Sequence, residues 1–119
     1  MSCIPGGMGV SQLEVEPGPI AHLEIEGDLD IAKAEELERQ LLRMEESSPD
    51  TVVIDLRNVT FIDSSGLRLI LRAEVRAQKA GRRLVLVRGP ERVHRVFQVT
   101  GLDSRLQFID DLARPSAKP

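Results

Sequence analysis

Residues 51–80 read TVVIDLRNVTFIDSSGLRLILRAEVRAQKA, and this stretch decides the fold that the sequence predicts. Its first part, VVIDL at 52–56, is β-branched and nearly all apolar, which is typical of a strand buried on both faces. Its last part has apolar residues at the spacing of one helical face, namely Leu67, Ile70, Leu71 and Val75. The stretch therefore predicts a strand, a short loop and turn, and an amphipathic helix.

Two serines, Ser64 and Ser65, lie where the turn opens into this helix, within FIDSSGL at 61–67. Free backbone N–H groups point out of a helix start, and the helix dipole is positive there. One interpretation is a simple N-cap, which contributes about 1 kcal/mol. The other is a phosphate site, because the same N–H groups and dipole favour an anion. Position alone favours the cap.

The elements on either side repeat the strand–helix pattern. Right-handed crossovers place the strands of such units parallel, whereas Pro17-Gly18-Pro19 predicts a tight turn between two antiparallel strands. We therefore expect an α/β fold: a mostly parallel sheet of about five strands with an antiparallel edge hairpin, and helices packed on it. The predicted elements are strands at 13–16, 21–26, 52–56, 84–87 and 106–109, and helices at 31–44, 64–80 and about 90–100.

Composition bounds the class of protein. The chain has 119 residues, 41% of them hydrophobic and 29% charged, which suits one globular domain. A net charge of −3 argues against direct nucleic-acid binding. No apolar run approaches the roughly 20 residues that span a bilayer, so we expect a cytoplasmic protein without membrane insertion. We expect a disordered tail at 1–11, one domain at 12–112 and a short tail at 113–119.

The quoted motifs carry a family resemblance. VVIDL followed by FIDSSGL resembles the signature of the STAS domain, in the branch of anti-sigma factor antagonists. Upstream, GDLD at 27–30 is similar to the family's G-E-L-D, with Asp in place of Glu. The resemblance covers roughly 13–112. It implies that a kinase, itself the anti-sigma factor, phosphorylates Ser64 to break its complex with this protein, and that a phosphatase acting on phospho-Ser64 restores binding.

The outer face of the serine helix is the second candidate feature. If the four apolar residues named above face inward, Arg68, Leu69, Arg72 and Arg76 point outward. Stacked arginines at i, i+4 and i+8 cost a few tenths of a kcal/mol per pair, and an exposed leucine among them is not explained by folding. The row is therefore either a binding ridge for an acidic partner or a solvated face. The resemblance favours the ridge, since the partner kinase docks on the serine loop and the neighbouring helix.

Acidic residues near the serines complete the predicted partner surface. One of Asp28 and Asp30 is expected to cap the helix at 31–44, and their loop should lie beside the Ser64 loop. Asp63 either shapes the serine turn or caps the helix. Gly66 would let a kinase approach the backbone closely. The predicted partner-binding residues are Asp28, Asp30, Asp63, Ser65, Gly66, Arg68, Leu69, Arg72 and Arg76.

The sequence does not favour an enzyme. A hydrolase would need a histidine near Ser64, and the chain has only His22 and His94. The D-S-S-G run lacks the G-x-S-x-G elbow that exposes a nucleophile, and no phosphate-binding loop or metal-ligand spacing is present. We expect neither cofactor nor metal. The alternative function is a STAS subunit of a stress-signalling scaffold or a lipid-transport complex.

Overall fold

The structure is a computed structural model that describes residues 19–110. Alternating strands and helices follow one another along this range, as the periodicity predicted. The elements are β1 (Ile20–Leu29), α1 (Ile31–Glu45), β2 (Thr51–Ile62), α2 (Ser64–Ala80), β3 (Arg83–Val87), α3 (Glu91–Val99), a 3₁₀ turn (Leu102–Ser104) and β4 (Gln107–Ile109).

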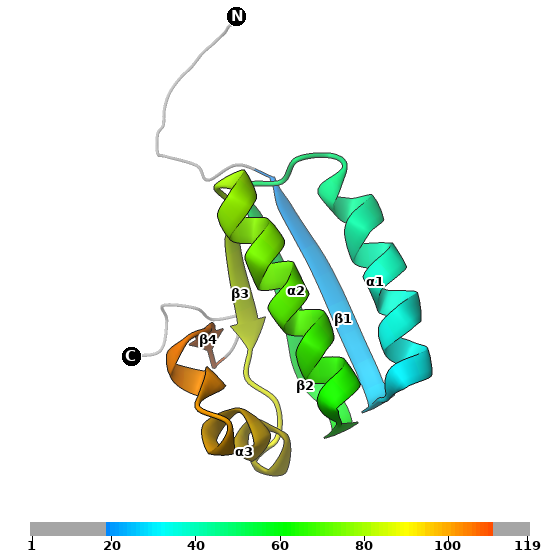
Figure 1. Cartoon of the computed structure of the whole chain (residues 1–119), viewed down its shortest axis with the longest axis vertical. Helices are drawn as coiled ribbons and strands as arrows, with labels where there is room; N and C mark the ends of the chain where they lie inside the picture. The colour runs from blue at the N-terminus through cyan, green and yellow to red at the C-terminus, as the bar shows by residue number, and fades with distance from the viewer. Residues whose placement is uncertain (1–18, 111–119) are drawn as a thin grey trace, which may run out of the picture.

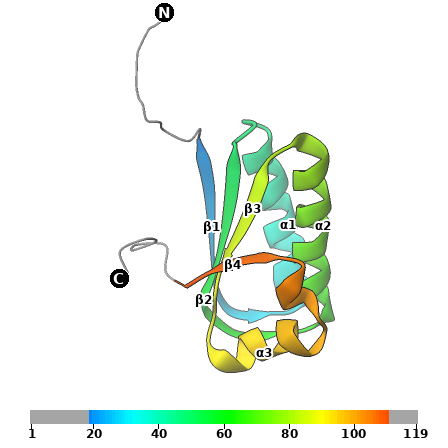
Figure 2. The ribbon, with the colours of Figure 1, turned by 90° about the vertical axis from the view of Figure 1, so that its left-hand side faces the viewer.

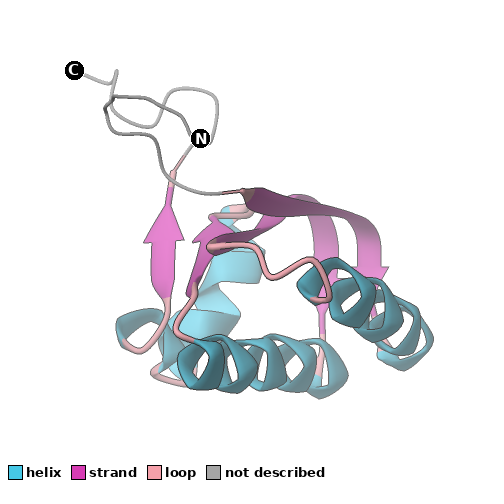
Figure 3. Cartoon of the chain, turned by 90° about the horizontal axis from the view of Figure 1, so that it is seen from above, coloured by secondary structure: helices cyan, strands magenta, loops and turns pink. Residues whose placement is uncertain are grey.

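The described strands form one sheet in the order β1-β2-β3-β4, and every neighbouring pair is parallel (Figure 1). A right-handed crossover that always moves to the next position leaves its helix on the same face of the sheet. Figure 3 shows the helices gathered on one side of the strands, and Figure 2 shows α1 and α2 packed side by side against that face. The prediction of a parallel α/β sheet is therefore confirmed.

Two parts of the fold prediction need separate treatment. The expected strand at 13–16 lies outside the described residues, so the antiparallel hairpin and the fifth strand stay predictions. The expected end of the central strand at Leu56 is wrong, because β2 continues to Ile62. The polar residues Arg57, Asn58 and Thr60 hide the strand pattern in the sequence. The C-terminal half of β1, from Glu26 to Leu29, pairs with this extension. A register shift between Glu24 and Glu26 comes before it.

The central strand is buried on both faces, as its composition predicted. Val52, Ile54 and Leu56 point into the core beneath the helices, while Val53 joins a smaller cluster on the other face with Val85, Val87 and Ile109. Asp55 is also buried on that second face, with 1% of its surface exposed. Hydrogen bonds from the Arg57 guanidinium, one of them 2.7 Å long, lower the pKa of the Asp55 carboxyl below its ordinary value.

The orientation of α2 differs from the sequence prediction. Its buried residues are Gly66, Leu69, Ile70, Ala73 and Ala77. Leu69 is 0% exposed and Val75 is 49% exposed, so the predicted outward position of Leu69 is wrong. The small Ala73 and Ala77, about one and two turns after Leu69, lie on the same buried face, and this packing turns the leucine inward. The sequence prediction of the inner face used only the large apolar residues and left out the alanines.

This orientation predicts unequal costs for two truncations on α2. Leu69→Ala should lower the free energy of unfolding by about 2–5 kcal/mol, because it leaves a cavity in the core. Val75→Ala should lower it by about 0.5 kcal/mol or less, because the side chain is half exposed. Urea unfolding followed by circular dichroism measures both values. Equal losses for the two variants would contradict the orientation.

Candidate functional site

The carboxyl ends of β1 and β2 and the first turns of α1 and α2 meet at one end of the sheet (Figure 1). Asp28 pairs with Phe61 and Leu29 with Ile62 in the β1–β2 register. The backbone N–H of Asp63 donates to the carbonyl of Leu29 over 3.4 Å. The segment at 27–30, called the acidic loop below, and the serine turn at 63–66 are therefore neighbours, as the sequence predicted.

Asp63, and neither serine, is the N-cap of α2. Its backbone is extended, and its Oδ1 accepts hydrogen bonds from the N–H groups of Ser65 at 2.9 Å and Gly66 at 3.2 Å. The interpretation of a serine as the cap is therefore wrong. Ser64 becomes the first helical residue with an exposed side chain, whereas Ser65 is half-buried. The sequence could not separate these roles, because Asp and Ser are equally good caps.

The acidic loop has two different carboxylates. Asp30 is the N-cap of α1 and accepts from the backbone N–H of Lys33 at 3.0 Å. Asp28 accepts from the Thr60 hydroxyl at 2.8 Å, which ties the end of β1 to β2. Both aspartates remain exposed beside the serine turn. This end of the molecule therefore presents fixed negative charge next to Ser64.

Gly66 has a packing role that corrects its predicted contact with a partner. It is buried, and it faces the strands at the start of α2. A Cβ at this position would lie 2.7 Å from Cγ of Leu29 and 2.8 Å from Cγ1 of Ile62. Only glycine allows the helix to begin this close to the sheet. Gly66 therefore has little exposed surface for a docked protein, and its packing determines where Ser64 lies.

The three arginines on α2 are not equivalent. Arg76 is the most enclosed: its Nε donates to Glu45 Oε1 at 2.7 Å and its Nη1 to Glu38 Oε2 at 2.8 Å. The Glu45 carboxylate raises the pKa of Arg76 above its ordinary value. Arg76 thus joins α2 to α1, and it also lines the groove on α2, so its predicted contact with a partner stays a prediction. The Nε of Arg72 lies 3.8 Å from Glu38 Oε2, and Arg68 is exposed.

Exposed apolar residues around the serine turn escaped the sequence analysis. Ile31, the first residue of α1, is 62% exposed, and Phe61, at the end of β2, is 51% exposed. On α2, Leu71 and Val75 line a shallow groove together with Arg68, Arg72 and Arg76. The available signal was the alternation in FIDSSGL, since Phe61 must point away from the face where Ile62 is buried. Unpaired apolar side chains beside charged ones are typical of a binding surface.

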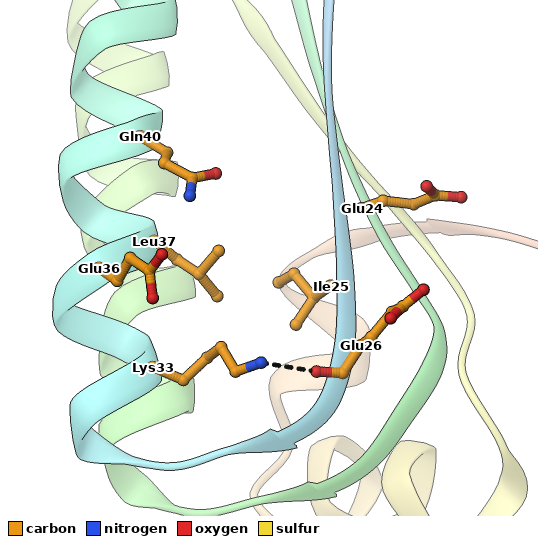
Figure 4. Close-up of a pocket in the computed structure, with 7 residues that line it drawn as sticks. All are labelled: Glu24, Ile25, Glu26, Lys33, Glu36, Leu37 and Gln40. Carbon is orange, nitrogen blue, oxygen red and sulfur yellow. Dashed lines mark hydrogen bonds between the residues drawn. The ribbon is translucent and has the colours of Figure 1, made fainter.

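A second depression lies between the edge strand β1 and α1 (Figure 4). The Nζ of Lys33 donates to the carbonyl oxygen of Glu26 at 2.9 Å. Glu24 and Glu36 also line the depression and charge its rim. The depression is thus lined mainly by polar and charged side chains, and we do not assign a ligand to it.

The two histidines lie in different surroundings, His22 on β1 and His94 on α3. His22 pairs with Val53, nine residues before Ile62, which is about 30 Å along an extended strand. The His94 ring packs against Phe97 and Phe108, and burial lowers the pKa of His94 below its ordinary value. Within residues 19–110, no three His, Cys, Asp or Glu side chains form a group that could hold a metal ion. No helix in that range has the length and apolar character needed to cross a bilayer.

Comparisons with known proteins found a matching family model and similar relatives. The model of the STAS domain matches residues 12–114. An anti-sigma-B factor antagonist of Staphylococcus epidermidis is 31% identical over 80 residues, which cover 67% of this chain and 74% of that protein.

Solved structures share the fold. An anti-sigma factor antagonist from Mycobacterium paratuberculosis superposes with a TM-score of 0.67 at 25% identity, covering 79% of this chain and 80% of that one. A sulfate transporter family protein from Wolinella succinogenes superposes with a TM-score of 0.71 at 23% identity, covering 84% of each chain. The second likeness shows the fold alone.

The close approach at Gly66 predicts a specific sensitivity. Gly66→Ala should lower the free energy of unfolding by about 1–3 kcal/mol, because Leu29 and Ile62 must shift to admit the methyl group. Ser65→Ala, at the adjacent half-buried position, adds no atoms and serves as the matched control. Urea unfolding of both variants gives the comparison. A Gly66→Ala protein as stable as the control would show that α2 does not depend on this contact.

Proposed function

Because the chain belongs to the STAS domain family, we propose that it is an anti-sigma factor antagonist. Its unphosphorylated form binds a serine-kinase anti-sigma factor and frees the sigma factor held by that protein. The kinase transfers the γ-phosphoryl group of ATP to Oγ of Ser64, the hydroxyl proton is released, and ADP leaves. A phosphatase acting on phospho-Ser64 restores binding. The protein is thus a cytoplasmic regulator and a substrate of another enzyme, not a catalyst.

The position of Ser64 carries this proposal. It is the first residue of α2, its side chain is exposed, and Asp63 already performs the capping that would otherwise occupy a serine hydroxyl. The hydroxyl is therefore available to a kinase. Ser65 is half-buried against the domain, which makes it the poorer acceptor. This difference agrees with the resemblance, which implied the first serine of the motif.

The surroundings of Ser64 support a docking surface. We propose that the partner contacts the exposed aspartates Asp28 and Asp30, the apolar Ile31 and Phe61 and the outer face of α2, and that Asp63 and Ser65 shape the turn beneath it. Apolar anchors supply affinity, and the charged rim selects and orients the partner. The arginine-flanked groove on α2 suits an acidic and apolar segment of that partner.

A phosphate in the middle of this surface is enough for a switch. It adds about −1.5 to −2 charges at neutral pH. A loss of about 1.4 kcal/mol of binding free energy weakens a complex tenfold. The likeness to curated anti-sigma-B factor antagonists supports this class of partner, since the alignment covers most of those proteins.

The test is a paired capture from lysate of the source cell. Ser64→Ala and Ser64→Asp proteins serve as baits, Ser65→Ala is the matched control, and captured proteins are identified by mass spectrometry. We expect an ATP-binding serine kinase on the Ser64→Ala and Ser65→Ala baits. It should bind the Ser64→Asp bait at least tenfold more weakly, because about 1.4 kcal/mol of lost contact has that effect.

Two outcomes would contradict the proposal. Equal capture of one large assembly by all three baits would favour a scaffold subunit and would make Ser64 a surface residue without a switching role. A captured kinase that binds the Ser64→Ala and Ser64→Asp baits equally in a purified binding assay would remove the switch while keeping the partner.

A further inference from the structure

One of the three arginines on α2, Arg68, lies near Ser64 and has no acidic partner among the described residues. Arg76 is committed to Glu45 and Glu38, and Arg72 lies 3.8 Å from the same Glu38. Arg68 is exposed, and it forms no ion pair or side-chain hydrogen bond with the described residues. It stands four residues after Ser64, so both side chains lie on one face of the helix, with Cβ atoms about 5–6 Å apart.

Two of the backbone donors at the start of α2 are already used. Asp63 accepts the N–H groups of both Ser65 and Gly66. A phosphate on Ser64 could take these donors only by displacing the N-cap, which would cost about 1 kcal/mol. The sequence had suggested that free N–H groups would hold a phosphate, and the observed capping engages two of them. A cation on the same face offers a phosphate a donor that does not displace the N-cap.

We propose that the Arg68 guanidinium of the same chain binds the phosphate on Ser64. This inference rests on the proposed function, which supplies the phosphate. An anion placed four residues before a cation is the favourable order on a helix, and it also lies at the positive end of the dipole. The guanidinium offers two parallel N–H groups to phosphate oxygens. Asp63, Asp28 and Asp30 repel the phosphate, and Arg68 offsets this repulsion.

Phosphorylation of Ser64 would then change the docking surface in two ways. The phosphate adds negative charge to the docking surface, and it also withdraws Arg68 from the α2 groove that faces the partner. The N-cap at Asp63 and the Arg76 clamp stay in place, so the fold does not change. An acidic partner segment therefore loses one of the cations that line the groove and also meets a new anion.

The experiment uses the full chain carrying phosphoserine at position 64, incorporated by genetic code expansion, so it needs no kinase. ³¹P NMR titration measures the second ionisation constant of the phosphate in the wild type, in Arg68→Gln and in Arg72→Gln. We expect the constant in the wild type to be about twofold larger than in Arg68→Gln, which is the effect of an exposed i, i+4 ion pair. Arg72→Gln, the matched control one turn further on, should titrate like the wild type.

Two results would overturn the inference. One is an Arg68→Gln phosphoprotein that titrates like the wild type. The other is an equal effect of Arg72→Gln, which would indicate a diffuse field in place of a direct contact. Raising the salt concentration to 0.5 M should shrink the difference between wild type and Arg68→Gln, because exposed ion pairs are screened. The proposed function is tested separately by the capture experiment, so failure of either one can be recognised.

Discussion

The close contact between the first turn of α2 and the ends of β1 and β2 is the constraint on which this structure depends. Gly66 leaves no space for a side chain against Leu29 and Ile62. The helix can therefore begin only where it does, directly after the paired ends of the two strands. This contact turns Ser64 to the surface and places it beside the acidic loop. A core packing requirement thus determines the geometry of the candidate site.

Some charged side chains near the candidate site hold the fold together, and others are exposed at the surface. Asp63 and Asp30 satisfy the backbone donors of α2 and α1. Arg76 joins the two helices through Glu45 and Glu38. These groups are engaged within the molecule and have little freedom to reorganise. What remains for recognition is a smaller set of exposed groups around Ser64, which suits a surface that one phosphate can change.

The relation between fold and function here is indirect. The same fold is found in an anti-sigma factor antagonist and in a sulfate transporter family protein. Parallel strands with helices on one face supply a scaffold, and the candidate site is formed by residues at one end of it. In this chain the distinguishing features are an exposed serine, an exposed phenylalanine beside it and a row of arginines in different states of pairing.

The amino-acid sequence alone determined the parallel strand–helix architecture of the described range and the place of Ser64 at a helix start. These follow from local periodicity and from turn and capping residues, which act over a few positions. The run at 52–56 was identified as buried on both faces because its composition admits little else. The neighbouring position of the two loops followed from parallel pairing of successive strands.

Tertiary structure alone decided which side of α2 is buried, how far β2 extends and what Gly66 does. Leu69 and Val75 fit a helix equally well, and only the surface they meet separates them. Likewise, Arg76 could be recognised as a clamp only once α1 brought Glu45 to it, 31 residues earlier in the chain. Local patterns specify elements, whereas contacts between residues distant in sequence decide which side chains are left for a partner.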